Sequence, residues 1–342
     1  MTRFVFPAQD IRRWGEDGLL QGYMARHVQP ASLDAIVASD KVHVLPGVIK
    51  PLPGQPVQEL LDTYGTHKFS IEDQPLLPRF HYLVQLTPGF KPAPTNIEVS
   101  PKSSIGRLDL HVRTLVDGYP GFDVVPANYS GPMYAIISPN SFPVRLSPGT
   151  PLTQLRFMQP QSGPVLTRSQ VYRDNVVQPS NKLHLYLADG FVGYKAKQVC
   201  RPVDLDCYDH KVDDFWERIV VDNGRYLLKR GEFGIFMTHD KVSIDPKEAG
   251  VLHPLSVEGG DLRIHYAGFI DPGFGYSHPN NIVLEIRPYE DVYLQHGEAI
   301  CHMRVDKLRD VPLVDGKPFN YDTHGTNYQQ QTTPRLSKFF KE

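Results

Sequence analysis

The sequence predicts a mainly β protein: two tandem copies of one domain, each a distorted β-barrel or jelly roll with few short helices. Three observations indicate this fold class: the composition, many short strand-like segments and a pair of internal echoes. The chain has 342 residues, with 31 prolines, 27 glycines, 17 phenylalanines and 17 tyrosines. Proline is about 9% of the chain against a typical ~5%, which favours short strands joined by turns.

Two short echoes along the chain predict the duplication. Val28-Gln29-Pro30 recurs as Val177-Gln178-Pro179, 149 residues later, and residues 148–157 resemble residues 296–305 at an offset of 148. Each match is short, but two in the same order at almost the same offset indicate a repeat. We therefore expect one domain over 1–160 and another over 165–342, joined by the polar, turn-rich residues 159–164.

The expected elements follow from local patterns. An amphipathic helix is predicted over residues 8–20, and a second is predicted to begin within 212–218, where two early carboxylates suit a helix N-terminus. Strands are predicted where short β-rich runs are mostly bounded by proline, glycine or asparagine. These runs are residues 81–86, 133–137, 183–187, 234–238 and 281–286.

Composition and missing motifs exclude several classes of protein. The formal net charge of −2 disfavours a basic groove for nucleic acid. Three cysteines are too few for a disulfide framework, no apolar run is long enough for a membrane span, and the first residues do not resemble a signal peptide, so we expect a cytoplasmic protein. Phosphate-loop, dinucleotide, G-x-S-x-G and zinc-deaminase patterns are absent. Cys200 and Cys207 are interpreted as ordinary thiols rather than zinc ligands.

Residues 101–108 concentrate hydrogen-bond donors. Ser103, Ser104 and Arg107 offer two hydroxyls and a guanidinium within five positions, next to Lys102. Such groups suit phosphate oxygens. The alternative is an ordinary polar turn with a solvated arginine.

A second informative segment combines a strong turn with an unexpected carboxylate. Asp271-Pro272-Gly273 predicts a turn, interpreted as the tip of a hairpin that returns through residues 281–286. Glu285 then shares a face with Val283, because side chains alternate along a strand. Burial there would raise the pKa of Glu285 and make it a candidate proton shuttle. The alternative is the solvent face of an edge strand.

Together these segments resemble the dCTP deaminase branch of the trimeric dUTPase-like superfamily. The matching patterns are Ser-Ser-x-x-Arg, Ile-Asp-Pro-Gly-aromatic and Val-Leu-Glu. Residues 29–34 resemble the family's early motif, and residues 328–331 with 336–338 resemble its C-terminal arm. The resemblance covers nearly the whole chain and is closest to the long, duplicated deaminases. It implies two tandem dUTPase-like domains.

The resemblance also implies roles for individual residues. Ser103, Ser104 and Arg107 would hold the triphosphate with help from Lys102, and Arg107 would also lie near the reacting centre. Asp271 would bind the deoxyribose 3′-hydroxyl, and Glu285 would be the general base and acid. The cytosine edge would be recognised by Ala267 and the backbone of Val283 and Leu284, and the phosphates would be covered by Tyr328 and Gln331.

The implied reaction converts dCTP to dUTP and ammonia without zinc. Glu285 would take a proton from water, the hydroxide would attack C4 of cytosine, and the proton would return as ammonia leaves. Mg²⁺ would arrive on the nucleotide triphosphate. No nucleic-acid or membrane partner is implied, and self-association as a homotrimer, or another assembly with a multiple of three repeats, is expected.

The two copies differ at the implied site. Aligning the repeats places Ile136 opposite Glu285, and residues 117–121 form a looser turn than Asp-Pro-Gly. Residues 255–260 stand where the Ser-Ser-x-x-Arg loop should recur, with only Arg263 nearby. Phosphate binding is therefore expected in the first copy and base chemistry in the second. This predicts a composite site, either within or between chains, and inactive isolated halves.

Two other functions remain open on these residues. A dUTP pyrophosphatase would use Asp271 to activate water but would not need Glu285, and a bifunctional enzyme would carry dCTP through to dUMP. A non-catalytic nucleotide-binding regulator would bind without turnover.

Overall fold

The computed structural model describes residues 2–161, 167–255, 262–264, 268–321, 328 and 331–341. Strands dominate, which confirms the predicted fold class. The first half contains β1 (Thr2–Val5), β2 (Leu20–Gln21), β3 (Val28–Gln29), β4 (Ser32–Val37), β5 (Lys41–Leu45), β6 (His67–Ser70), β7 (His81–Phe90), β8 (Asn96–Pro101), β9 (Leu110–Val116), β10 (Val124–Val125), β11 (Gly131–Pro139), β12 (Val144–Arg145) and β13 (Pro151–Gln161).

The second half continues the numbering, and helices are short throughout. Its strands are β14 (Gln170–Arg173), β15 (Val176–Val177), β16 (Lys182–His184), β17 (Gly190–Ala196), β18 (Val203–Asp204), β19 (His210–Lys211), β20 (Trp216–Val221), β21 (Arg225–Leu228), β22 (Gly234–Ser243), β23 (Glu248–Pro254), β24 (Leu262–Ile264), β25 (Phe269–Ile270), β26 (Asn280–Pro288), β27 (Val292–Gln295), β28 (Ala299–Leu308), β29 (Leu313–Val314), β30 (Lys317–Pro318) and β31 (Phe340–Lys341). The helices in the described residues are α1 (Ala8–Glu16), η1 (Ala25–His27), α2 (Val57–Tyr64), α3 (Ser103–Gly106) and α4 (Val212–Phe215).

The strand pairing of the first half recurs in the second. In the first half β13 pairs with β4 and β8, and in the second half β28 pairs with β16 and β23. Likewise β11 lies between β7 and β9, as β26 lies between β22 and β24. The sequence echo at an offset of 148 thus falls on β13 and β28, which have corresponding neighbours in the two halves.

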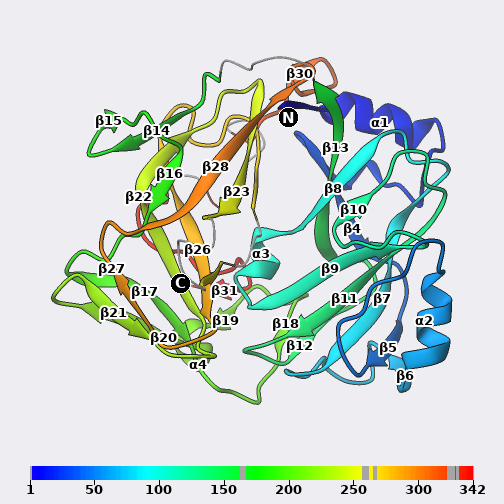
Figure 1. Cartoon of the computed structure of the whole chain (residues 1–342), viewed down its shortest axis with the longest axis horizontal. Coiled ribbons are helices and arrows are strands. Elements are labelled where there is room, and N and C mark those ends of the chain that lie inside the picture. The colour runs from blue at the N-terminus through cyan, green and yellow to red at the C-terminus, as the bar shows by residue number, and fades with distance from the viewer. Residues whose placement is uncertain are drawn as a thin grey trace.

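The two halves share a sheet and a core. β1 pairs antiparallel with β13 and parallel with β28, so one four-residue strand joins the sheets of both halves. Buried side chains of the first half pack in one cluster with Trp216, Phe233 and Val283 of the second half. Figure 1 shows the halves side by side, with α3 between them and the C-terminal segment close to it.

One predicted helix ends earlier than expected, and the other is a single turn. The helix predicted over 8–20 ends at Glu16, because Gly18 takes a positive φ of 78° and Leu20 pairs with Phe90. The helix predicted to begin within 212–218 is the single turn α4, after which the chain enters β20. Helices α2 and α3 were not predicted.

The predicted strands are found, with one shortened and one hairpin wrong. Four of the five lie within β7, β11, β22 and β26, whereas the strand predicted over 183–187 ends at His184. The Asp271-Pro272-Gly273 turn forms, but β25 before it pairs with β23 and β26 after it pairs with β22 and β24. The segment therefore crosses from one sheet to another instead of closing a hairpin.

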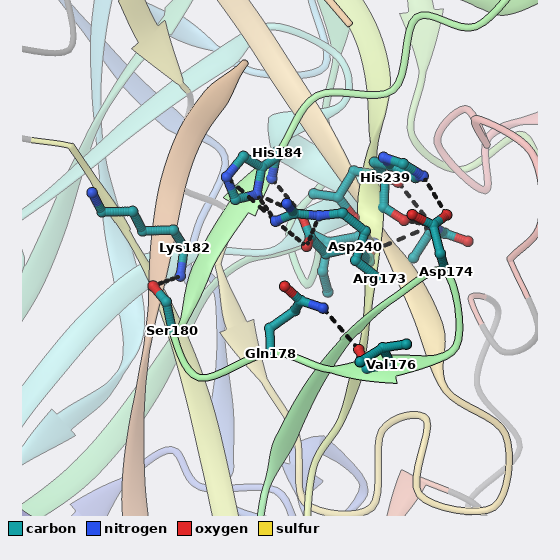
Figure 2. A network of polar contacts seen from close by, with 12 residues as sticks. Arg173, Asp174, Val176, Gln178, Ser180, Lys182, His184, His239 and Asp240 are labelled. Carbon is teal, nitrogen blue, oxygen red and sulfur yellow. Dashed lines mark hydrogen bonds and ion pairs between the residues drawn. The ribbon is translucent and has the colours of Figure 1, made fainter. Parts of the chain in front are cut away.

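A buried polar network ties three strands of the second half together. The Asp240 carboxylate on β22 has no exposed surface and accepts hydrogen bonds from Arg173 on β14 at 2.8 and 3.0 Å. It also accepts the backbone N–H of His184 on β16 at 2.6 Å, as Figure 2 shows. Because a buried carboxylate needs such donors, this network fixes the positions of the three strands.

Candidate active site

A cavity of about 320 Å³ opens where the two halves meet. Its size falls within the range of small-molecule sites. Its walls come from α3, β25, the start of β26 and the C-terminal segment. The lining residues are Gln29, Asp34, Lys102, Ser103, Ser104, Arg107, Pro151, Gln154, Leu252, Gly268, Phe269, Ile270, Asp271, Phe274, Ile282, Val283, Tyr321, Tyr328, Gln331 and Lys338.

Arg107 lies at the centre of this junction. It caps the C-terminal end of α3, where its N–H donates to the carbonyl of Ser103 at 3.0 Å, and it is only 4% exposed. Its Nη1 donates to the carbonyl of Arg335 at 3.0 Å, and its Nη2 contacts Oε1 of Gln331 at 3.4 Å. The guanidinium carbon lies 3.9 Å from the centre of the Tyr328 ring. The solvated-arginine alternative is therefore wrong.

Glu285 faces Arg107 from the second half. It lies on β26, which has neighbours on both sides, and it is 4% exposed, so the edge-strand alternative is also wrong. Its Oε1 lies 3.8 Å from Nε of Arg107. Burial raises the pKa of Glu285 to about 8, and the positive charge of Arg107 opposes that rise. The result is a carboxyl group that titrates near neutral pH.

Arg107 and Glu285 lie close together but do not form a direct hydrogen bond. A distance of 3.8 Å is longer than a hydrogen bond. Nε of Arg107 is buried and has no hydrogen-bond partner among the described residues. A water molecule or a substrate atom between the two groups could complete the contact.

Asp271 begins the turn that leaves β25, and its carboxyl lines the same cavity. Burial raises the pKa of Asp271 to about 6, while the charges of Arg156 and Lys102 lower it and Asp34 raises it. Gly273 follows with a φ of 83°, which L side chains rarely adopt, so glycine suits this turn. The turn thus places a carboxyl group with a raised pKa at the cavity wall.

Lys102 enters the cavity already paired. Its Nζ lies 2.6 Å from Oδ1 of Asp34, whose other oxygen accepts a weak 3.4 Å hydrogen bond from Gln29.

Lys338 also lines the cavity. Burial lowers the pKa of Lys338, and the charge of Lys102 lowers it further while Asp34 raises it. The cavity thus holds several cationic groups and two carboxylates.

Most residues singled out from the sequence gather here. The cavity is lined by Lys102, Ser103, Ser104, Arg107, Asp271, Val283, Tyr328 and Gln331. Glu285 is not among the lining residues but lies 3.8 Å from Arg107, which is. Leu284 points into the core of the second half with Ile282 and Ile286. Ala267 lies outside the described residues.

Sequence reasoning gave no role to Asp34, Gln154, Arg156 or Lys338. Asp34 lies on β4 among buried aliphatic residues, so the argument applied to Glu285 would have found it. Arg156 is fully buried against the Phe269 ring, 4.2 Å from its centre. No sequence signal marks that arginine, because its neighbours come from the other half of the chain.

The equivalent position in the first half is apolar and covered. Ile136 on β11 is fully buried in a cluster with Leu115 and with Val57 and Leu61 of α2. Helix α2 thus packs over the strand that corresponds to β26, where the second half carries Glu285. The two halves are therefore chemically unequal.

Fold and cavity together define a nucleotide-modifying enzyme of the dUTPase-like superfamily. The family model described as 2′-deoxycytidine 5′-triphosphate deaminase, N-terminal domain, matches residues 3–161, and the C-terminal domain model matches residues 155–340. The chain therefore belongs to the dCTP deaminase family, and it is an enzyme that deaminates dCTP.

Individual relatives agree with this assignment. The crystal structure of 2′-deoxycytidine 5′-triphosphate deaminase from Agrobacterium tumefaciens superposes with a TM-score of 0.81 at 29% identity, over 92% of this chain and all of that one. A protein of Methanothermobacter thermautotrophicus named "dCTP deaminase, dUMP-forming" is 26% identical over 171 residues, which are 47% of this chain and 79% of the relative.

Three further features concern partners and metals. Among the described residues, no helix combines the length and apolar character needed to cross a membrane. In the same part of the chain, no three His, Cys, Asp or Glu side chains are grouped to hold a metal ion. The three cysteines are free, with Cys200 exposed and Cys301 buried.

Proposed function

We propose that this enzyme converts dCTP to dUTP and ammonia with Glu285 as the general base and acid. The main support is the position of Glu285 of the second half beside Arg107 of the first half. Both side chains are buried, and Oε1 of Glu285 lies 3.8 Å from Nε of Arg107, which lines the cavity. A proton acceptor and a fixed cation lie side by side there, as a deamination through a charged intermediate requires.

In the proposed mechanism the ionised Glu285 takes a proton from a water molecule. The hydroxide attacks C4 of the cytosine ring and forms a tetrahedral intermediate. Glu285 returns this proton to N3 of the ring and then carries the proton of the new C4 hydroxyl to the amino group. The C4–N bond breaks, ammonia leaves and C4 becomes a carbonyl carbon. A carboxyl with a pKa of about 8 suits both steps, since it accepts and returns a proton at little cost near neutral pH.

We assign the triphosphate to the first half of the chain and the C-terminal segment. Ser103, Ser104 and Arg107 offer donors from α3, and Tyr328 and Gln331 cover the guanidinium. Lys102 is paired with Asp34, so it can contact a phosphate only by sharing its charge between the two. Mg²⁺ would enter with the triphosphate as part of the substrate.

We assign the sugar and the base to the second half. The carboxylate of Asp271 would accept a hydrogen bond from the deoxyribose 3′-hydroxyl. The rings of Phe274 and Tyr321, whose centres are 5.0 Å apart, would crowd the position of a 2′-hydroxyl. Ala267 and the backbone of Val283 and Leu284 would recognise the cytosine edge. These assignments predict a preference for deoxycytidine nucleotides over ribonucleotides.

A second candidate product is dUMP. The relative from Methanothermobacter thermautotrophicus is named dUMP-forming. Asp271 could activate a second water molecule for attack on the α-phosphate, which would release pyrophosphate. A pyrophosphatase step needs Asp271 but not Glu285, so the two activities separate by mutation.

The test is incubation of the purified protein with dCTP and Mg²⁺, with ammonia, dUTP, dUMP and pyrophosphate measured together. Ammonia with stoichiometric dUTP supports the proposal, whereas ammonia with dUMP and pyrophosphate supports the bifunctional alternative. Deamination by Glu285→Gln at the wild-type rate would overturn the mechanism.

Assembly and location complete the proposal. We expect self-association with a number of domain copies divisible by three, and a cytoplasmic location. Light scattering on the eluting protein peak tests the assembly. A stable single chain in that measurement would overturn this part.

A further inference from the structure

A second pair of charged side chains lies directly beside Arg107 and Glu285. Asp109 follows Arg107 by two positions, and Arg287 follows Glu285 by two. Nε of Arg287 donates to Oδ1 of Asp109 at 3.1 Å, and its Nη2 contacts the other carboxylate oxygen. The first half thus supplies the cation of one pair and the anion of the other.

The backbone at Asp109 indicates that its side chain is needed. The residue follows α3 with a φ of 55°, in the left-handed region where glycine is the usual choice. Its carboxylate has no exposed surface and accepts a 2.7 Å hydrogen bond from the hydroxyl of Ser141. Glycine would fit the turn better, so the carboxylate is the feature that favours aspartate.

The alternation of β26 directs Arg287 and Glu285 to the same side. Side chains two positions apart share a face of a strand. Val283 on that face packs into the core shared with the first half, whereas Leu284 and Ile286 on the opposite face pack into the core of the second half. Arg287 also donates to the carbonyl of Gly231, so it is anchored on both halves.

We propose that Arg287, held by Asp109, is a positioning residue that sets β26 against the turn after α3 so that Glu285 stands beside Arg107. This inference rests on the proposed function of Glu285. The guanidinium of Arg287 is bonded to Asp109, to the carbonyl of Gly231 and to the hydroxyl of Ser141, so it acts through the strand and not on the substrate. Without Arg287, β26 would lose its contacts with the buried Asp109 carboxylate, and Glu285 would move away from Arg107.

The test compares Arg287→Gln with Arg287→Lys and with the double variant Asp109→Asn/Arg287→Gln. We expect Arg287→Gln to lower kcat by about tenfold to a hundredfold, the scale set by small misplacements of catalytic groups. KM for dCTP should change by less than about threefold, because the phosphate and sugar contacts are untouched. Arg287→Lys keeps the charge and should recover part of the rate. The double variant removes the buried Asp109 charge together with its half-buried partner, so it remains informative if the single variant does not fold.

The titration of Glu285 is the readout that a purely structural role would not move. Carbon-13 NMR of labelled glutamate, with Glu285→Gln to assign the signal, should show Glu285 titrating at higher pH in Arg287→Gln. Loss of the Arg287 charge and a more distant Arg107 both favour the neutral carboxyl. The matched control is Asp240→Asn in the network of Figure 2, which breaks another buried ion pair. It should lower Tm without moving this titration.

The outcomes separate the two proposals. An unchanged kcat together with an unchanged Glu285 titration in Arg287→Gln would overturn the positioning role. If the wild-type protein releases no ammonia from dCTP, the proposed function fails instead. In that case the NMR titration still tests whether Arg287 sets the environment of Glu285.

Discussion

Nε of Arg107 lies 3.8 Å from Oε1 of Glu285, although the two residues belong to different halves of the chain. Both residues are buried. The first half cannot form this pair by itself, because it has Ile136 at the position that corresponds to Glu285. The single-chain fold itself brings the cation and the carboxyl together. Four predictions follow from this pairing.

Replacing Glu285 by glutamine should reduce deamination by about 10²–10⁴-fold, the usual contribution of a general acid–base group. The amide keeps the shape of the side chain but cannot take a proton from water. Ammonia release from dCTP under saturating substrate measures the effect. Glu290→Gln makes the same change at an exposed glutamate of the same half and should retain full activity. A rate close to wild type in Glu285→Gln would contradict the assigned role.

The same substitution should stabilise the protein at alkaline pH. The folded pKa of Glu285 is raised from 4.5 to about 8, so between those values the folded state binds a proton that the unfolded state has lost. Stability therefore falls as pH rises from about 4.5 to about 8, by an amount on the order of a few kcal/mol. Urea unfolding should show that the free energy of unfolding of Glu285→Gln, relative to that of the wild type, is larger at pH 8.5 than at pH 5. An equal difference at both values would contradict the raised pKa.

Catalysis at low dCTP concentration should increase with pH and level off above about pH 8. Only the ionised Glu285 can accept the proton of water, and kcat/KM reports the ionisation of the free enzyme. Arg107→Gln removes the charge that lowers this pKa, so any residual activity should show its rising limb at higher pH. A limb near pH 4.5 in the wild type would indicate an ordinary, solvated carboxyl.

Mixing inactive chains should not restore activity. Arg107 and Glu285 contact each other within one chain, so Arg107→Ala and Glu285→Gln chains each lack a complete site. Mixed and refolded together, they should show no more activity than the sum of the separate proteins. Recovery well above that sum would indicate sites shared between chains, which the sequence had left open.

The chemistry of the site was easier to predict than its architecture. Glu285 stands out in the sequence because a carboxylate interrupts an apolar run, but only the strands on both sides of β26 exclude the solvent face of an edge strand. The Asp271 turn was recognised from Asp-Pro-Gly, but turn chemistry does not specify which strands pair, so the hairpin was wrong. Strand partners are set by contacts between distant segments, which local sequence does not encode.

Other parts of the site depend entirely on tertiary contacts. Arg156 is buried under Phe269, and Arg107 is covered by residues more than 220 positions away. Nothing near either arginine in the sequence indicates burial. Helix α2, which covers Ile136, was missed because its eight residues give only two turns of periodicity.

The dependence of Arg107 on the last part of the chain has a consequence for synthesis on the ribosome. The Ser-Ser-x-x-Arg segment emerges before its partners: Arg107 precedes Glu285 by 285 − 107 = 178 residues, and it precedes Gln331 and Arg335 by more than two hundred. β1 likewise pairs with β28, which is translated much later. A nascent chain therefore carries the cationic loop without a working catalyst until the residues up to Arg335 have been translated, which makes the appearance of activity a late event in synthesis.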